Sequence, residues 1–529
     1  MATLIGYVLS ATAGLVASLP FTDVSPGAAW FCLAPAFYCV ASAARMRHAM
    51  GRAAVFALVW TFCSLWFIAQ NTTAGMVVLC IYTSLYYVLA LLGVRVLARR
   101  GVWSAVFGSA AMWALVEIAR SRLPVFGFPW LLLGHAASEW RELRQAADLL
   151  GVYGLSFLIV SVNAALAFLV PPLVSARVAA PPGPASRRRW CLTFVACLVL
   201  ATLIYGRWRL GVLTPLVREG ARVALIQGCA YQKIGRTQDE KWQQLRQHLK
   251  LHAEAARPTL GQERPDLIGW AETMAPGTFN QDPYAKDLLK CVAEFGVPTL
   301  CGADWIHPDD LELPILEQRW YNAAFVLDGS GRELAHYAKR RLVPFGEYVP
   351  LRSALPFLHA FGTVTRDTYT PGASPSPVVR VAGADFALNV CIEDCHPDLA
   401  REAAWRGASA FLNVTNDAWF AGTHAVRSHL QAASFRAIEL RRPLVRATNS
   451  GVSAQVTPLG DVQVAIPPDH IGVGRLRLAL LSQPQPRTPA MYMGEFWVAV
   501  LLCLVLIGGW LADARRERGR LLQAQRSVH

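Results

Sequence analysis

The chain has 529 residues, which is more than one ordinary hydrophobic core accommodates. Apolar residues make up 54% of it and charged residues only 16%, a composition that argues against a soluble protein and indicates a membrane protein. The net charge is +14, but the basic residues fall mostly in short loops between apolar segments, which favours a topology signal over nucleic-acid binding. The 12 cysteines form neither a CxxC pair nor a zinc-like Cys/His spacing, so no disulfide framework and no metal site is expected.

Eight apolar stretches are long enough to cross a bilayer. They lie at about 3–20, 27–44, 53–70, 75–97, 102–119, 150–173, 190–212 and 494–512. No basic residue precedes the first stretch and six more follow it before residue 213, so it is expected to be a retained helix and not a cleaved signal peptide. The sequence therefore predicts a bundle of about seven transmembrane helices over 1–212, a last transmembrane helix over 491–512 and a basic tail over 513–529.

Arginines gather in alternate loops, and this pattern predicts an orientation. The clusters are Arg45, Arg47 and Arg52; Arg95, Arg99 and Arg100; Arg177 and Arg187 to Arg189; and Arg515, Arg516, Arg518 and Arg520 in the tail. The loops at 21–26 and 70–74 carry no Lys or Arg. The positive-inside rule then places both termini in the cytoplasm and residues 213–490 on the outer face. Within the loop 120–149, the segment 127–134 is apolar but too short to span, and it is expected to be re-entrant or interfacial.

Between residues 213 and 490 the pattern changes to short strand-like runs separated by helix-compatible stretches. The predicted strands are Val223–Gly228, Leu267–Glu272, Thr299–Ala303, Ala323–Asp328, Phe386–Ile392, Ala410–Thr415, Leu444–Thr448 and Ser453–Pro458. The predicted helices are 238–256, 283–295, 397–406 and 424–441. Alternating strands and helices predict an α/β domain inserted between the helical bundle and the last span.

Three reactive side chains stand at or near the ends of strand-like runs: Glu272, Lys339 and Cys391. A cysteine thiol becomes a strong nucleophile when it is deprotonated, and Glu272 could accept that proton if a dry site raises its pKa. Lys339, kept charged by nearby carboxylates, would stabilise the oxyanion of a tetrahedral intermediate. Glu347 follows a Pro-Phe-Gly turn and is expected to orient Lys339 or a substrate amine. Together these residues predict a covalent acyl-transfer site.

Two further residues lie close to Cys391 in the sequence. Glu393 is two positions on and would share the face of Cys391 on an extended strand, where it could tune the site. Cys395 is a rival nucleophile because it precedes His396, although neighbours in sequence are rarely catalytic partners. Simpler interpretations are also open, because a cysteine in an apolar strand is usually a packing residue and the basic run 339–341 is usually a solvated surface or a headgroup contact.

Several short motifs accompany these residues. They are Gly127-Phe128-Pro129-Trp130, Trp270-Ala271-Glu272, Leu342-Val343-Pro344-Phe345-Gly346-Glu347, Cys391-Ile392-Glu393, Asn416-Asp417-Ala418-Trp419-Phe420 and the run from Arg442 to Gly451. With these motifs, the 213–490 region resembles the carbon–nitrogen hydrolase (nitrilase) superfamily. The resemblance implies an α-β-β-α sandwich with Glu272 as general base, Lys339 as oxyanion stabiliser and Cys391 as nucleophile.

The same resemblance implies roles for three supporting residues. Glu347 is similar to an additional essential glutamate, while Glu393 and Trp419 match positions that shape the active site and the passage of substrate. It also assigns the nucleophile to Cys391 over Cys395, because the Cys-x-Glu motif precedes the Asn-Asp-Ala-Trp-Phe block.

Taken over nearly its whole length, the chain is similar to the bacterial apolipoprotein N-acyltransferases. That resemblance implies transfer of a fatty acyl chain from a phospholipid, through a Cys391 thioester, to the α-amine of the diacylglyceryl cysteine of lipoproteins. It places the protein in the bacterial cytoplasmic membrane as a monomer that needs no cofactor and binds no nucleic acid. Three positions depart from the usual pattern, namely Ile392, Ala271 and Cys229. The apolar segment 354–363 is expected to form a lid, and Trp419 to help seat an acyl chain.

Two other functions are consistent with the same residues. A membrane-tethered amidase or nitrilase would use the same triad with water as the acceptor. A non-enzymatic membrane scaffold could retain an inactive hydrolase domain, although the intact Glu272, Lys339 and Cys391 argue against it.

Overall fold

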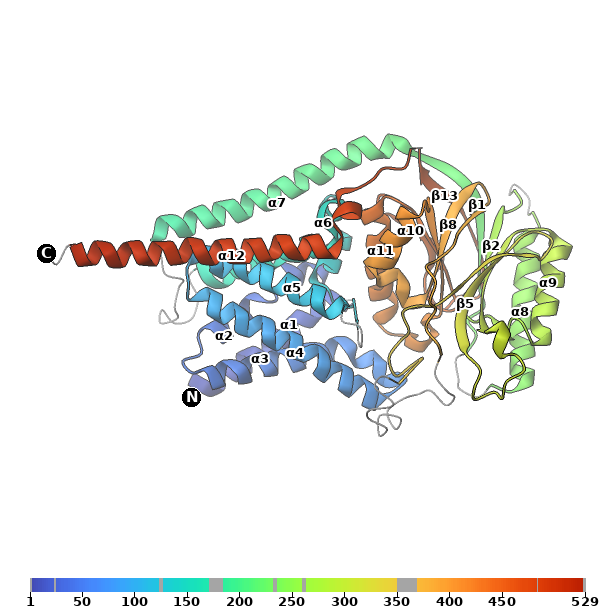
Figure 1. Cartoon of the computed structure of the whole chain (residues 1–529), viewed down its shortest axis with the longest axis horizontal. Helices are drawn as coiled ribbons and strands as arrows, with labels where there is room; N and C mark the ends of the chain where they lie inside the picture. The colour runs from blue at the N-terminus through green and yellow to red at the C-terminus, as the bar shows by residue number, and fades with distance from the viewer. Residues whose placement is uncertain are drawn as a thin grey trace. The chain divides into compact units, whose positions relative to one another are not determined.

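A computed structural model describes residues 2–22, 25–122, 127–170, 184–231, 236–258, 263–349, 369–482 and 484–526 (Figure 1). The chain divides into two compact units. One contains Met1–Trp66, Met76–Arg209 and Met493–His529, and the other contains Phe67–Gly75 and Leu210–Tyr492. Residues 67–75, which the sequence assigned to the helical bundle, therefore cluster with the second unit. The predicted lid at 354–363 lies outside the described residues.

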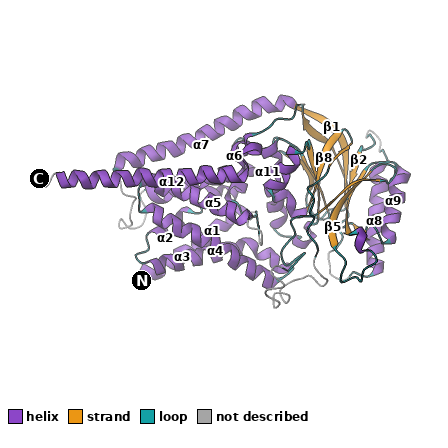
Figure 2. Ribbon diagram, in the orientation of Figure 1, coloured by secondary structure: helices purple, strands orange, loops and turns teal. Residues whose placement is uncertain are grey.

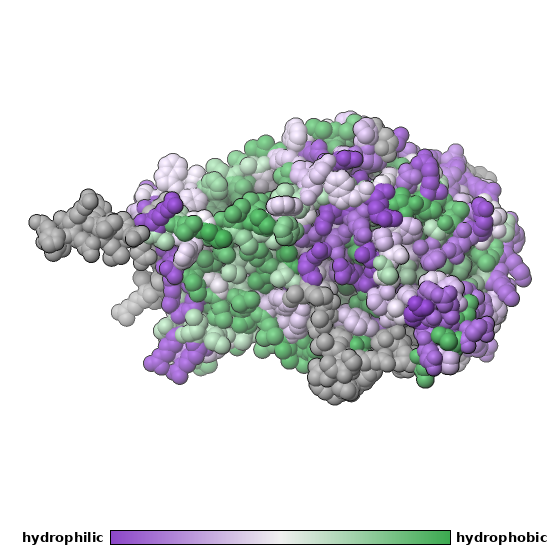
Figure 3. Space-filling model, viewed as in Figure 1, coloured by the Kyte–Doolittle hydropathy of each residue, from purple (hydrophilic) through white to green (hydrophobic). Residues whose placement is uncertain are grey.

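The first unit is helical. Its helices are α1 (Ala2–Ser18), α2 (Ala34–Ala41), α3 (Met46–Leu65), α4 (Thr73–Ala98), α5 (Ser109–Arg122), α6 (Ala147–Leu169), α7 (Ala185–Leu213) and most of α12 (Pro489–Arg526). Within the described residues, six helical stretches are long and apolar enough to cross a membrane. The surface of these helices is largely apolar in the space-filling view (Figure 3), as expected of a surface that faces lipid.

Two of the eight predicted spans coincide with shorter helical stretches. The predicted span 27–44 corresponds to the apolar helical segment Pro26–Ala41. The predicted span 102–119 contains a π-helical turn, Ser104–Gly108, that continues into α5. The number of spans predicted from hydropathy therefore exceeds the six long apolar helices of the structure, because hydropathy does not register where a helix breaks or changes its hydrogen-bond pattern.

The apolar segment that follows α5 is buried and largely irregular. Trp130 to Leu133 are each at most 4% exposed. Buried charges on α5 hold this backbone, since Arg120 donates to the carbonyls of Phe128 and Trp130 and Glu117 accepts from the amide of Leu133 at 2.9 Å. These hydrogen bonds satisfy irregular backbone from within the protein, and the re-entrant or interfacial placement of the segment stays a prediction.

The second unit is a four-layer sandwich (Figures 1 and 2). One sheet has the order β13-β1-β2-β4-β5-β6, with β3 paired to β4, and the other has the order β12-β11-β10-β9-β8-β7. The strands of the first sheet are β1 (Val217–Gln227), β2 (Leu267–Gly269), β3 (Ala275–Thr278), β4 (Thr299–Ile306), β5 (Trp320–Leu327), β6 (Glu333–Ala338) and β13 (Gly472–Leu481). Those of the second are β7 (Val378–Val381), β8 (Ala384–Val390), β9 (Ala410–Thr415), β10 (Leu444–Thr448), β11 (Ser453–Val456) and β12 (Val462–Ile466).

Apolar residues with strand periodicity explain this layering. Inward-facing side chains of both sheets, such as Leu225, Val326, Leu388 and Leu412, share one buried core. The outer face of the first sheet is covered by α8 (Gln238–Ala256) and α9 (Pro283–Phe295), and that of the second by α10 (Pro397–Trp405) and α11 (Ala425–Leu440). The predicted α-β-β-α sandwich is thus the architecture of this unit.

The two predicted strands that included Glu272 and Cys391 end earlier than expected. The strand predicted at Leu267–Glu272 stops at Gly269, and the strand predicted at Phe386–Ile392 stops at Val390. The residues Cys391–Cys395 form a 3₁₀ turn instead. Glu393 therefore does not share a strand face with Cys391, and that part of the sequence prediction is wrong.

Candidate active site

The predicted site residues follow directly after strands of the sandwich. Lys339 is the first residue after β6, Cys391 is the first after β8, and Glu272 lies three residues beyond β2. Gly302 on β4 makes room for the Glu272 backbone, because a Cβ at this position would lie 2.6 Å from the Glu272 Cα atom. The sheets thus present these side chains at strand ends, where catalytic groups are commonly held.

Left-handed backbone occurs at Cys391 and close to Glu272 and Glu347. Cys391 itself has a φ of 53°, Thr273 beside Glu272 has 52°, and Phe345 in the turn before Glu347 has 62°. Non-glycine residues adopt this conformation at a cost of about 1–3 kcal/mol, and such residues concentrate at functional sites. The sharp turn after β8 stops the nucleophile from continuing the strand.

Lys339 joins two carboxylates in a buried cluster. Its Nζ lies 2.8 Å from Oε1 of Glu347 and 3.4 Å from Oε1 of Glu272, and its side chain is 1% exposed. Asn322 on β5 bridges the same two carboxylates, donating from Nδ2 to Glu272 at 2.6 Å and to Glu347 at 2.9 Å. The amide of Val343 donates to the second oxygen of Glu347 at 2.7 Å. One ammonium is therefore fixed between two acids by a rigid set of hydrogen bonds.

Burial and these charges raise the pKa of both Glu272 and Lys339. Burial raises the pKa of Glu272, with Glu347 raising it further and Lys339 opposing the shift. Burial also disfavours the charged form of Lys339, but Glu347, Glu272 and Cys391 outweigh it and hold the pKa of Lys339 well above its usual value. The site thus combines a carboxylate of increased basicity with an ammonium that stays charged.

Cys391 is 8% exposed and responds to the same charges. Burial raises the pKa of its thiol to about 12, with Glu272 raising it and Lys339 lowering it. The resting thiol is therefore neutral, and its proton must leave to a base as the sulfur attacks. Asn413 on β9 donates to the carbonyl oxygen of Cys391 at 3.0 Å, which fixes the turn.

Glu393 is fully buried and ties the nucleophile turn to the lysine loop. Its Oε1 accepts from the amides of Arg340 and Arg341 and from the Tyr337 hydroxyl, and its Oε2 accepts from the amide of Val390. It thereby joins the Tyr337 side chain and the backbone that follows Lys339 to the end of β8. The sequence indicated that Glu393 shapes the site, and its hydrogen bonds show the structural means of doing so.

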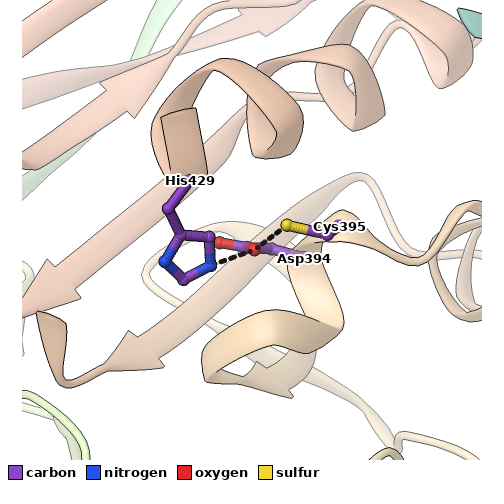
Figure 4. A group of neighbouring side chains, drawn as sticks. All are labelled: Asp394, Cys395 and His429. Carbon is purple, nitrogen blue, oxygen red and sulfur yellow. Dashed lines mark hydrogen bonds and ion pairs between the residues drawn. The ribbon is translucent and has the colours of Figure 1, made fainter. Parts of the chain in front are cut away.

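The rival thiol, Cys395, belongs to a second buried cluster (Figure 4). Its Sγ lies 3.5 Å from Oδ1 of Asp394, and the same oxygen lies 3.0 Å from Nε2 of His429. The other ring nitrogen of His429 lies 2.8 Å from Asp417, and Arg446 pairs with Asp394 at 3.0 Å. Burial raises the pKa of the Cys395 thiol, as it raises that of the Cys391 thiol, so the thiol pKa does not distinguish the two.

This second cluster has the ligand types of a metal site but not its chemistry. Asp394, Cys395 and His429 lie close enough to share an ion. Both nitrogens of His429 face carboxylates, which outweigh burial and Arg446 and hold the pKa of His429 well above its usual value. A doubly protonated imidazole cannot ligate a metal, and the adjacent guanidinium repels a cation. The cluster is therefore a balanced network of two cations and two carboxylates behind the nucleophile turn.

Trp419 lies in a short 3₁₀ turn after β9 and is part-exposed. The segment 67–75 packs here: Asn71 donates from Nδ2 to the Trp419 carbonyl at 2.8 Å, and the Phe67 ring meets Phe420 edge-on at 5.2 Å. This contact brings a loop from between two predicted spans into the surroundings of the site.

Sequence reasoning missed Asn322 and the network of His429 and Arg446. Asn322 lies inside an otherwise apolar strand, and a buried amide in such a strand is the signal that could have identified it. The network residues are spread over α11, β10 and two turns, so no local spacing connects them. The sequence did place Glu272, Lys339 and Glu347 together, and the structure brings these three into one cluster.

Two known families match parts of this chain. Residues 222–481 match the carbon–nitrogen hydrolase family, and residues 13–165 match the apolipoprotein N-acyltransferase N-terminal domain. A solved amidase from Nesterenkonia sp. is 21% identical, covers 50% of this chain and 93% of its own, and gives a TM-score of 0.35. The class is therefore that of a multi-pass membrane protein that carries a carbon–nitrogen hydrolase domain.

Full-length relatives define the family more narrowly. The apolipoprotein N-acyltransferase of Geobacter metallireducens is 31% identical over 482 residues, which is 87% of each chain. That of Allorhizobium ampelinum is 31% identical over 418 residues, covering 78% of this chain and 75% of its own. This chain belongs to the apolipoprotein N-acyltransferase family, and it is an N-acyltransferase.

Proposed function

We propose that this protein transfers a fatty acyl chain from a phospholipid to the α-amine of the N-terminal diacylglyceryl cysteine of lipoproteins, with Glu272, Lys339 and Cys391 as catalytic residues. The observation that carries the proposal is the buried cluster in which Lys339 lies within 3.4 Å of both Glu272 and Glu347 while its charge and that of Glu272 act on the Cys391 thiol. Both substrates, the phospholipid and the lipoprotein, carry acyl chains that insert into a membrane, and six candidate spans would hold the enzyme in the same membrane.

In the first half-reaction, the Cys391 sulfur attacks the carbonyl carbon of the sn-1 ester as Glu272 accepts the thiol proton. The carbonyl oxygen becomes an oxyanion beside the Lys339 ammonium, which stabilises it. Collapse of this intermediate breaks the ester C–O bond, and Glu272 returns the proton to the departing glycerol oxygen. A lysophospholipid leaves, and the acyl chain remains on Cys391 as a thioester.

In the second half-reaction, the lipoprotein amine attacks the thioester carbon. Glu272 accepts a proton from the amine, Lys339 again stabilises the oxyanion, and the C–S bond breaks. The proton returns to the sulfur, so the enzyme is restored and an amide is formed. The two lipid substrates need not be bound together, so ping-pong kinetics are expected.

Three residues support this chemistry in the proposal. Glu347 holds Lys339 in place together with Glu272, and Glu393 fixes the turn that presents Cys391. Trp419 helps to seat an acyl chain. We further propose that the enzyme works as a monomer without a cofactor, in the bacterial cytoplasmic membrane. Its termini would lie in the cytoplasm and its hydrolase domain, residues 213–490, on the outer face, as the arginine-rich loops predict.

An acyl-transfer assay tests this function. Purified enzyme is mixed with a phospholipid labelled in its sn-1 chain and with a diacylglyceryl peptide, and the label is followed by mass spectrometry. We expect the label on the peptide amine, and a thioester adduct on the Cys391 peptide when acceptor is omitted. The adduct should be absent from Cys391→Ala and retained in Cys395→Ala, a matched loss of the neighbouring thiol. Release of free fatty acid at the same rate with and without acceptor would instead identify a hydrolase.

A further inference from the structure

A basic cleft lies at the opposite edge of the second sheet from Cys391. The strands β8, β9 and β10 run parallel, and Cys391 follows the end of β8. The cleft is lined by residues at or just before the starts of the same strands, among them Asp385, Ser409 and Arg442. Six residues of strand separate Asp385 from Cys391, a distance of about 20 Å at about 3.3 Å per residue. The cleft is therefore separate from the catalytic site.

Arginine dominates the lining of this cleft. Arg218, Arg380, Arg442 and Arg487 contribute to it, whereas Asp385 is the one carboxylate among its lining residues. Asp385 is already paired with Arg380 at 2.9 Å. No carboxylate in the described part of the chain pairs with Arg218, Arg442 or Arg487. Three positive charges therefore converge on one space without a neutralising partner from the protein.

Arg442 is the lining arginine whose charge is least favourably placed. Its side chain is 4% exposed, and it donates to the backbone carbonyls of Ala408 and Leu440. Burial lowers its pKa to about 10, and the charge of Arg487 lowers it further. Arg487 itself rests over the Trp405 ring at 5.6 Å. A buried guanidinium beside a second fixed guanidinium favours the arrival of an anion, which would relieve both their desolvation and their repulsion.

Two of the lining arginines lie near the junctions between this unit and candidate membrane spans. Arg218 comes five residues after the end of α7, and Arg487 comes two residues before the start of α12. Both helices contain candidate membrane spans, so the two junctions between span and domain each supply an arginine to the cleft. Met491, in the first turn of α12, adds an apolar wall. The cavity volume is about 520 Å³, within the range of about 300–1,000 Å³ that is typical of small-molecule sites.

We propose that this cleft binds the phosphate-bearing headgroup of an anionic phospholipid, at a site distinct from the one that performs acyl transfer. Arg218, Arg442 and Arg487 contact the phosphate, and the lipid chains enter the bilayer beside the end of α7 and the start of α12. The positive charge disfavours a zwitterionic headgroup, whose cationic end would be repelled. A lipid held here would anchor the domain at the two junctions through which it is joined to the membrane.

Hydrogen exchange in nanodiscs tests this proposal. The full-length protein carrying Cys391→Ala, which cannot form an acyl-enzyme, is placed in phosphatidylcholine with or without phosphatidylglycerol. Exchange of the amides at 405–409 and 484–488 is followed by mass spectrometry. We expect phosphatidylglycerol to slow this exchange by about tenfold, because a bound headgroup bridges these segments. Since no acyl transfer occurs, the outcome does not depend on the proposed reaction.

Paired charge removals provide the comparison. The double variant Arg218→Gln/Arg487→Gln removes two exposed arginines of the cleft and should abolish the slowing of exchange. The control, Arg246→Gln/Lys250→Gln, removes two exposed charges from α8 and should preserve the slowing. Equal slowing in both double variants, or equal exchange in the two lipid mixtures, would overturn the proposal. Inorganic phosphate is added to phosphatidylcholine discs in a further arm, and protection equal to that by phosphatidylglycerol would identify free phosphate as the ligand and overturn the lipid assignment.

Discussion

Two buried charged clusters lie at the same edge of the sandwich, and they differ in balance. The cluster around His429 pairs two cations with two carboxylates and leaves each at most 1% exposed. The cluster around Lys339 sets one cation against two carboxylates, and the Glu347 side chain is 13% exposed. The balanced cluster is suited to holding backbone in place. The unbalanced one keeps a carboxylate with a raised pKa beside a thiol, which is what proton transfer requires.

The largest expected effect comes from removing the cation of the unbalanced cluster. Lys339→Met should reduce kcat/KM for acyl transfer by about 10³-fold, because the oxyanion loses its stabilising charge. The rate of label transfer from phospholipid to peptide measures this. Lys290→Met, which removes an exposed lysine of the same unit, is the control and should leave the rate unchanged. A Lys339→Met enzyme with nearly full activity would remove Lys339 from the mechanism.

The next effect concerns the balanced cluster and should appear in stability. Arg446→Met leaves Asp394 and Asp417 buried beside His429 alone, and we expect a loss of about 3 kcal/mol in folding free energy. Thermal unfolding in detergent measures the loss. Arg477→Met breaks exposed pairs with Glu219 and Glu263 and should cost about 1 kcal/mol or less. Equal losses of folding free energy in the two variants would show that the buried network stabilises the fold no more than an exposed ion pair does.

A smaller effect is expected where the two clusters meet in the backbone. Glu393→Gln exchanges one carboxylate oxygen for an amide nitrogen that cannot accept, so it loses either the hydrogen bond from the Val390 amide or those from the Arg340 and Arg341 amides. We expect kcat to fall about tenfold through a looser nucleophile turn, while KM for phospholipid changes little. A higher KM for phospholipid without a change in kcat would contradict a positioning role.

The smallest expected effect is a dependence of the folding free energy on pH that comes from His429. Because the folded pKa of His429 is raised, its contribution to stability is complete below the unfolded value of about 6.5 and is lost as pH rises through the folded pKa. Stability should therefore decline above about pH 6.5, by no more than about 1.4 kcal/mol per pH unit for one proton. His429→Gln should flatten this decline, as measured by thermal unfolding at a series of pH values. An unchanged slope would place the responsible proton elsewhere.

The sequence predicts the fold better at its centre than at its edges. Apolar strands such as Ala410–Thr415 and Leu444–Thr448 were predicted with their observed bounds. The strands β6 and β12 were missed because they carry charged or exposed residues on a sheet edge or near one, where burial no longer selects apolar side chains. β13 was missed because its glycines and arginines interrupt the apolar alternation.

For the site, the order of reactive residues was readable but their local geometry was not. Motif residues placed Glu272, Lys339 and Glu347 near strand ends, and these three form the observed cluster. The left-handed turn at Cys391 has no glycine to announce it, so the strand was extended too far. Glu393 accepts hydrogen bonds from amides of a loop more than fifty residues earlier in the chain, and no local sequence pattern predicts such a contact.

The segment 67–75 changes how the hydrolase domain can be isolated. The chain passes between the two units at 66/67 and 75/76 as well as at 209/210 and 492/493. A recombinant fragment of residues 210–492 would lack Phe67, which stacks edge-on against Phe420 and His424, and Asn71, which caps the Trp419 carbonyl. Such a truncation would leave the Phe420 ring and the Trp419 turn uncovered, and grafting the missing nonapeptide onto the fragment is the rational remedy.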